Sequence, residues 1–232
     1  MSMLSLFLTL LIYAAAKAGY RRWSYAIFSP LVICPLLLIS LLLLNHIPYA
    51  FYQSGTDSLT QMLQPATVAF AVPLYKYRHL IKEYAGELVA GVLGGSVVAI
   101  LSSLIYAKWL HIDNLELLGS LAPRSITTPM AMNASQSIGG VPAMTAVFVI
   151  LTGLTGILVA PLLLRVLPLK NRISQGMLLG MGAHAAGTAK AYELGNQHGA
   201  IASLTMIFAG VATLLLAPFV VPAFMQFLTF SF

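Results

Sequence analysis

The residues best suited to bind a ligand lie in one polar stretch, LAPRSITTPMAMNASQSIGGV, at positions 121–141. Arg124 carries a permanent positive charge, and its planar guanidinium suits a carboxylate. Hydroxyl and amide side chains follow, at Ser125, Thr127, Thr128 and Asn133. Thr128 is placed as the N-cap of a short helix with Pro129 at its first position. Because helix N-termini attract anions, the stretch predicts a binding site for a small organic anion.

The same residues allow a structural alternative. In that interpretation Arg124 extends to a membrane interface, and the hydroxyl groups only cap a kink. Ionisable side chains at membrane depth usually serve a function, but the sequence does not give the depth of Arg124. Both interpretations therefore stay open at this stage.

A second polar segment lies within positions 173–194. Small and polar residues recur there every four positions and so share one helix face, at Gly176, Gly180, His184 and Thr188. We predict that the glycines permit close packing and that the helix breaks near Gly187. His184 and Thr188 would then face Arg124 across a cavity.

His184 is also a candidate for proton coupling, because histidine titrates near neutral pH. The alternative is a core histidine bonded to a backbone carbonyl group. Lys190 and Glu193 are further coupling candidates, and their alternative is to pair with each other, since residues three apart on a helix are neighbours.

A third polar segment, LTQMLQPATVAFAVPLY, covers positions 59–75. Pro65 and Pro73 argue against one continuous helix, because each proline removes a backbone hydrogen bond. The hydroxyl of Thr67 would complete the predicted cavity. A proline-kinked packing helix is the alternative.

The composition indicates what must position these residues. Of 232 residues, 59% are hydrophobic and 8% are charged, whereas soluble domains carry about 25% charged residues. We therefore predict one all-α polytopic membrane domain over 1–232, with seven to eight segments of about 20 residues. The net charge of +6 lies in short loops, which favours a role in membrane orientation over nucleic-acid binding.

The basic loops predict the orientation of the chain, because such loops stay on the cytoplasmic side. They cover 17–22, 76–82 and 165–172. The loops at 45–57 and 107–120 are then external. The next span has to start outside to reach the third basic loop, so we predict that 121–141 enters the membrane and returns on the same side.

The spans before and after this re-entrant segment form two triplets that run in opposite directions, over 26–107 and 142–224. The middle member of each triplet, at 59–75 or 173–194, is the interrupted one. Inverted repeats with paired broken helices are typical of secondary transporters.

Several classes of chemistry lack a basis in the sequence. Cys34 is the single cysteine, which excludes an intrachain disulfide and a cysteine metal cluster. Nucleotide-binding, zinc-protease and serine-hydrolase motifs are missing. We therefore expect no enzymatic activity, no cofactor and no bound metal.

Four segments resemble the LrgB/CidB family of bacterial membrane proteins. They are LQPATVAFAVPLYK (63–76), LAPRSITTPMAM (121–132), QSIGGVPAMTAVFVILTG (136–153) and GMGAHAAGTAKAYELG (180–195). The resemblance extends over nearly the whole chain, and the family is similar to the membrane part of the plastidic glycolate/glycerate translocator of plants. Arg124 stands where many members have lysine, so the positive charge is kept.

The resemblance implies a multi-pass protein of the bacterial plasma membrane with one of two functions. The first is secondary transport of a small monocarboxylate such as glycolate, glycerate or pyruvate by alternating access. The alternative is an antiholin-like subunit that works with a small holin-like partner of the LrgA/CidA type to control murein hydrolases and autolysis. The glycine-rich helix faces also predict a homo-oligomer.

Overall fold

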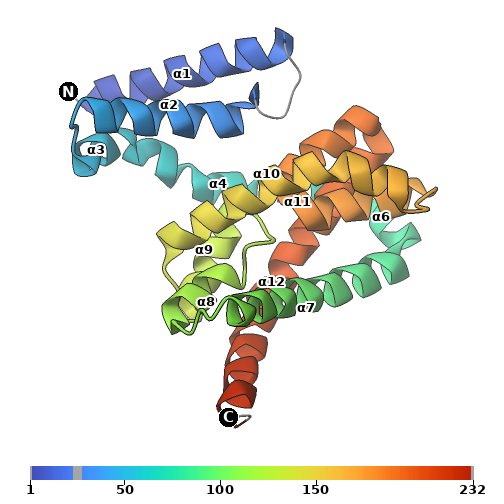
Figure 1. The fold of residues 1–232 in the computed structure, drawn as a ribbon. Helices are drawn as coiled ribbons and strands as arrows, with labels where there is room; N and C mark the ends of the chain where they lie inside the picture. The colour runs from blue at the N-terminus through green and yellow to red at the C-terminus, as the bar shows by residue number, and fades with distance from the viewer. Residues whose placement is uncertain (1, 23–27, 231–232) are drawn as a thin grey trace. The chain divides into compact units, whose positions relative to one another are not determined.

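The computed structural model describes residues 2–22 and 28–230, and within these ranges it contains helices and no strand (Figure 1). The all-α prediction is thereby confirmed for the described residues; the start of the predicted span at 26–44 lies outside them. The helices are α1 (Ser2–Arg22), α2 (Pro30–Leu44), α3 (Tyr49–Gln61), α4 (Leu63–Val68), α5 (Ala71–Lys76), α6 (Arg78–Glu83), α7 (Ala85–Trp109), α8 (Leu115–Leu121), α9 (Thr128–Ser137), α10 (Pro142–Val166), α11 (Arg172–Leu194) and α12 (Asn196–Phe230).

Four of the described helices are long and apolar enough to cross a membrane: α1, α7, α10 and α12. α2 is equally apolar, but it has 15 residues and a full crossing needs about 20. The protein is therefore a helical membrane protein, and the predicted total of seven to eight membrane segments stays a prediction.

The chain divides into two compact units with a boundary between Val68 and Ala69. In the first unit α1 packs against α2 and α3, and the hydroxyls of Thr9 and Tyr52 lie 2.9 Å apart. The loop predicted over 45–57 is wrong for most of its length, because α3 begins at Tyr49. α3 is largely polar, so the hydrophobic pattern of the sequence does not indicate this helix.

The prediction of a broken helix over 59–75 is confirmed. Turns separate α3 from α4 and α4 from α5, and α5 ends at Lys76 before α6 begins. Pro65 and Pro73 lie inside α4 and α5, where each proline limits the continuous helical hydrogen bonding. The first of these short helices belongs to the first unit and the other two to the second.

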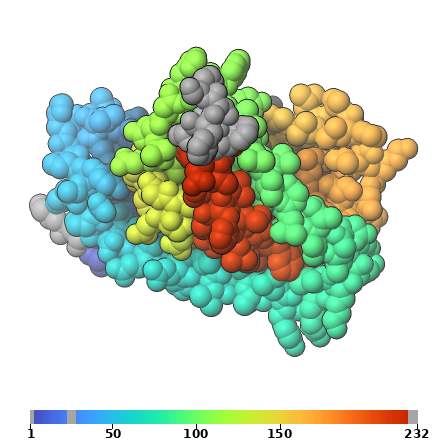
Figure 2. Space-filling view, turned by 90° about the horizontal axis from the view of Figure 1, so that it is seen from below, coloured from blue at the N-terminus to red at the C-terminus, as the bar shows by residue number. Residues whose placement is uncertain are grey.

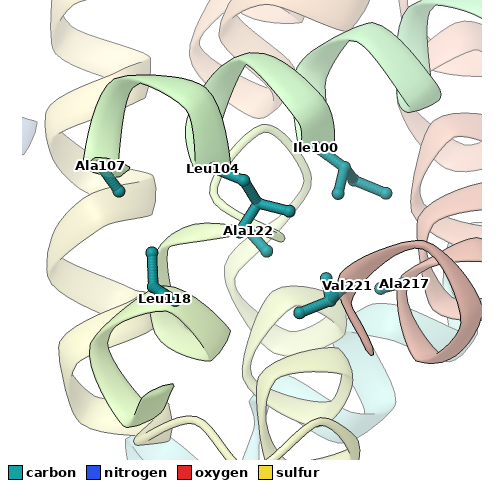
Figure 3. Close-up of a cluster of buried hydrophobic side chains, with 7 residues drawn as sticks. All are labelled: Ile100, Leu104, Ala107, Leu118, Ala122, Ala217 and Val221. Atoms are coloured by element: carbon teal, nitrogen blue, oxygen red, sulfur yellow. The ribbon is translucent and has the colours of Figure 1, made fainter. Parts of the chain in front are cut away.

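In the second unit α7 and α12 pack along their lengths in the same direction. Near the start of both helices, Leu88 of α7 lies in one buried cluster with Ile201 of α12. Further along both, Ile100 of α7 shares a cluster with Ala217 and Val221 of α12 (Figure 3). Figure 2 shows α12 in red with α7 in green along one side. The loop charges predicted opposite directions for these two helices. The prediction is wrong because α11, which precedes α12, reverses its direction at Ala183 and His184.

Candidate functional site

The polar stretch after α7 forms a helical hairpin. Its two arms are α8 and α9, and its ends meet, because the hydroxyl of Ser120 accepts a hydrogen bond of 2.7 Å from the N–H of Val141. A side chain on Gly140 would overlap the backbone at Gly119 and Ser120. We call residues 115–141 hairpin 1. Its chain enters and leaves at one place, which is the shape that a re-entrant segment requires.

The double glycine of hairpin 1 serves the closure of its ends. Gly139 has a φ of +79°, a conformation that side chains with a Cβ rarely adopt. Gly140 supplies the close backbone approach. The two glycines therefore have different roles in the same turn. A substitution would strain the backbone at Gly139 and would cause a steric clash at Gly140.

α11 also folds back on itself, which the sequence did not predict. Ala183 and His184 leave the helical conformation, and His184 has φ +38° and ψ −122°. Leu179 and Ala191 lie in one buried cluster, although twelve residues span about 18 Å in a straight helix. We call residues 172–194 hairpin 2. It returns the chain to the side from which it came, so α12 runs in the same direction as α7.

The break predicted at Gly187 lies instead at Ala183 and His184. Gly187 is the contact between the two arms, since a Cβ there would overlap the carbonyl oxygen of Leu179. Gly176 and Gly180 abut α12 with no room for a side chain, so the predicted close packing of these glycines is confirmed. The glycines shape the hairpin, but they do not form its turn.

The tips of both hairpins line one cavity of about 550 Å³. Hairpin 1 contributes Arg124, and hairpin 2 contributes Gly182 and Ala183. The remaining wall comes mainly from α7 and α10 and is largely aliphatic and aromatic. The hairpin tips therefore meet at a cavity in which Arg124 provides the charge.

Neutral hydroxyl groups hold the guanidinium of Arg124. Its Nε donates to Oγ of Ser103 at 2.9 Å, and its Nη1 donates to Oγ1 of Thr152 at 3.2 Å. Each hydroxyl gives its own proton to a carbonyl of its own helix, at Ala99 or Phe148, which leaves oxygen lone pairs for the guanidinium. Within the described ranges, Arg124 has no aspartate or glutamate at ion-pair distance. Its charge is therefore oriented without being neutralised.

The other predicted residues of hairpin 1 take different positions. α9 begins at Thr128, and Thr127 is its N-cap, one residue earlier than predicted. The hydroxyl of Thr127 is buried without a hydrogen-bond partner. Ser125 and Thr128 are half-buried, and Asn133 is exposed.

The predicted residues of hairpin 2 do not line the cavity. Nε2 of His184 bonds to the carbonyl oxygen of Val149 on α10 at 3.0 Å, which is the arrangement of the core-histidine alternative. The hydroxyl of Thr188 donates to the sulfur of Met206 at 3.7 Å. Lys190 and Glu193 pair with each other at 2.5 Å. The site thus brings together Arg124 and the backbone around the turn of hairpin 2.

Thr67 belongs to the first unit. Its hydroxyl donates to the carbonyl of Leu63 at 2.9 Å, one turn earlier in the same helix. This bond satisfies the hydroxyl locally. The role predicted for Thr67 in a cavity stays a prediction.

Sequence reasoning missed the two hydroxyls that orient Arg124. Ser103 and Thr152 lie in the apolar helices α7 and α10, where they do not interrupt the hydrophobic pattern. A signal was available, since a hydroxyl inside a membrane helix often serves contacts between helices. The hydrogen bonds from Arg124 to these two residues could not be predicted without knowing how hairpin 1 folds.

Comparison with known proteins confirms the family resemblance that the four sequence segments indicate. Residues 9–223 match the model of the LrgB-like family. The chain belongs to the LrgB-like family. A relative of Bacillus subtilis (strain 168), "Uncharacterized protein YwbG", is 52% identical over 215 residues, which cover 93% of this chain and 95% of the relative.

Other LrgB-like relatives carry a functional name. The "Antiholin-like protein LrgB" of Bacillus subtilis (strain 168) is 35% identical over 202 residues, or 87% of this chain and 85% of the relative. The protein of the same name from Bacillus cereus (strain B4264) is 32% identical over 204 residues, or 88% and 86% of the two chains. No solved structure matches the chain.

Proposed function

We propose that this LrgB-like protein is a secondary carrier of small monocarboxylates of the glycolate, glycerate or pyruvate type. It would work by alternating access in a bacterial plasma membrane that it crosses several times. The observation that carries the proposal is the guanidinium of Arg124, which reaches the cavity without an acidic partner among the described residues.

The electrostatics of Arg124 favour an anionic ligand. Removing a charge from water is costly unless an opposite charge or full hydrogen bonding compensates it. Ser103 and Thr152 use two N–H groups of Arg124, and a guanidinium has five. A carboxylate would take up remaining donors and neutralise the charge, and the paired geometry of the two groups makes such bonds strong.

The two hairpins suggest a revised inverted repeat. α7 leads into hairpin 1, and α10 leads into hairpin 2. Loop charges put the mouth of hairpin 2, beside Lys170 and Arg172, on the cytoplasmic side. Hairpin 1 follows α7, which begins just after the basic loop at 76–82. The mouth of hairpin 1 is therefore expected on the external side. We propose that these two helix-and-hairpin pairs, in place of 26–107 and 142–224, are the repeats that approach a central site from opposite sides.

His184 remains our candidate for proton coupling. It forms the turn of hairpin 2, and its ring is bonded to α10 through Val149. Protonation would change what this ring can bond, and so would act on the contact between hairpin 2 and α10. Lys190 and Glu193 already satisfy each other and are weaker candidates.

Uptake of labelled glycolate and pyruvate into proteoliposomes tests the proposal. We expect Arg124→Ala to lower uptake at least tenfold, since a hydrogen bond to a charged group contributes about 1.5–3 kcal/mol. Arg124→Lys should keep part of the activity, because lysine retains the positive charge but cannot form the paired hydrogen bonds of a guanidinium to a carboxylate. Arg165→Ala is the matched control, as Arg165 lies in the last turn of α10 and does not line the cavity. Uptake by Arg124→Ala at the wild-type rate would refute the assignment.

A second function has support from the names of the relatives. Two relatives are called antiholin-like, and a subunit with that function would need a protein partner. α2 is apolar, yet it has no buried residue. The part of its surface that does not pack against α1 is therefore available to lipid, to a second copy of the chain or to a small LrgA/CidA-like membrane protein. Copurification with such a partner, without carboxylate uptake by the isolated protein, would favour this function over transport.

A further inference from the structure

The cavity at Arg124 is longer than a small hydroxy acid. Its wall on α10 extends from Phe148 to Leu163, and Arg124 bonds to Thr152 near the first of these residues. The eleven residues from Thr152 to Leu163 span about 16 Å at 1.5 Å per residue. Along the α10 wall the charged group therefore lies nearer to Phe148 than to Leu163.

On α10, the long part of the cavity offers a ligand no further side-chain hydrogen-bond donor among the described residues. Beyond Thr152 its wall on α10 consists of Thr155, Gly156, Val159, Ala160 and Leu163. Thr155 donates its hydroxyl proton to the carbonyl of Leu151 at 2.8 Å, so it has no proton left to donate to a carboxylate. Leu178 and Leu179 of hairpin 2 complete this apolar part.

The charge pattern limits the ligand further. Among the described residues that line the cavity, Arg124 is the one with a charge. A second carboxylate on the ligand would meet no cation, and an ammonium would meet no acid. These features favour a single anionic group followed by an apolar chain over a dicarboxylate or an amino acid.

The side of the cavity gives such a ligand an entrance. Tyr106 on α7 is 59% exposed and Leu151 on α10 is 54% exposed, and both line the cavity. The space therefore opens between two apolar helices on a surface that would face lipid. An amphiphile can reach Arg124 from that side without passing its tail through water.

We propose that the cavity binds a monocarboxylate with an unbranched apolar tail, with the carboxylate on Arg124 and the tail along α10 towards Leu163. This inference rests on the proposed function in one respect, the use of Arg124 to bind a carboxylate. It extends the substrate class from small hydroxy acids and keto acids to medium-chain acids. A volume of about 550 Å³ lies in the range of about 300–1,000 Å³ that holds drug-sized ligands.

The binding test uses the full chain in lipid nanodiscs and a series of straight-chain acids from acetate to octanoate. Binding is followed by the rise in melting temperature with acid concentration. We expect the dissociation constant to fall about fourfold for each added methylene, which corresponds to about 0.8 kcal/mol per buried CH₂. Methyl esters of the same acids measure partition into lipid and should give no specific shift.

Three variants distinguish binding in the cavity from partition of the acid into lipid. Arg124→Ala should abolish the difference between acid and ester. Val159→Trp fills the apolar part and should weaken octanoate at least tenfold while leaving acetate unchanged. Leu162→Trp is the matched control, because Leu162 is an exposed residue of the same helix that does not line the cavity.

The outcomes distinguish the two proposals. An affinity that does not increase with chain length, or that increases equally in Arg124→Ala, would overturn the tail site, even if glycolate and pyruvate are transported. Arg124-dependent binding of octanoate without any carboxylate uptake would support the tail site and refute the carrier function.

Discussion

Hairpin 1 and hairpin 2 reverse the chain by different means. Hairpin 1 uses two separate helices joined by residues 122–127, and the hydrogen bond from Val141 to Ser120 closes its ends. Hairpin 2 reverses within two residues, Ala183 and His184. Its arms meet at Gly187, and Gly176 and Gly180 pack against α12. The longer connection leaves room for a charged side chain at the tip of hairpin 1. The tight turn of hairpin 2 instead presents backbone and small side chains to the cavity.

This comparison predicts that hairpin 2 is the more sensitive of the two to added side-chain volume. Gly180 has the backbone of Ala202 against it, and a rigid backbone cannot move aside as a flexible side chain can. Gly180→Val should lower the free energy of unfolding by an amount at the upper end of about 1–3 kcal/mol, the usual cost of overpacking. Thermal unfolding of the detergent-solubilised protein measures the effect.

Gly94→Val on α7 is the matched control, since a Cβ at Gly94 meets nothing within 4 Å. Equal melting temperatures for the two variants would show that hairpin 2 is not held by close packing. The difference between the hairpins would then lie only in their turns.

For hairpin 1 the sensitive feature is a polar contact. Ser120→Ala removes the acceptor of the N–H of Val141 and the donor to the carbonyl of Glu116. Leaving a buried N–H without a partner costs about 1–3 kcal/mol, and because this bond is only partly buried we expect a loss in the lower half of that range. Ser137→Ala is a suitable control, because the hydroxyl of Ser137 bonds only locally, to Ala134, in the described residues.

Two measurements test this prediction: the hydrogen-exchange rate of the Val141 amide and the melting temperature. Ser120→Ala should accelerate exchange at the ends of hairpin 1 and leave hairpin 2 unchanged. Protection of Val141 at the wild-type level would mean that the glycine contact alone closes the hairpin.

The sequence predicted hairpin 1 and missed hairpin 2 for a physical reason. Basic loops, which the positive-inside rule assigns to the cytoplasmic side, predict the return of hairpin 1, and its polar residues mark it. After Lys190 the chain contains no lysine or arginine, so loop charge could not fix the direction of α12. The turn of hairpin 2 contains neither proline nor glycine at the reversal itself.

The site was predictable to a similar degree. Arg124 stands out as a charge in an apolar chain, and the structure gives it a cavity. Its partners Ser103 and Thr152 lie 21 and 28 residues away in the sequence. Such contacts depend on how the helices pack, and the hydrophobic pattern along a single helix does not encode them.

A smaller effect is expected where hairpin 2 contacts its surroundings. The hydroxyl of Tyr192 lies 3.2 Å from that of Tyr77 and accepts from Ser203 at 3.4 Å. Tyr192→Phe should lower the free energy of unfolding by about 0.5–1 kcal/mol, since these bonds are long and partly exposed to solvent. Tyr49→Phe in the first unit serves as control, and a melting temperature equal to that control would show that the hydroxyl contact does not stabilise hairpin 2.

The smallest expected effect concerns the loop that leads into hairpin 1. Lys108 donates to Asp113 at 2.8 Å, and this bond, together with the positive charge, lowers the pKa of the Asp113 carboxyl. Because the pKa is lower in the folded protein, the pair contributes stability above the pKa of the unfolded chain, and that contribution is lost as pH falls through the folded value. The side chain of Asp113 is 69% exposed and that of Lys108 is 39% exposed, so salt should screen the effect. Melting temperatures between neutral and acidic pH should therefore fall slightly less for Asp113→Asn than for the wild type at low salt, and equally at high salt. A steeper acid dependence in the variant would contradict the assigned sign.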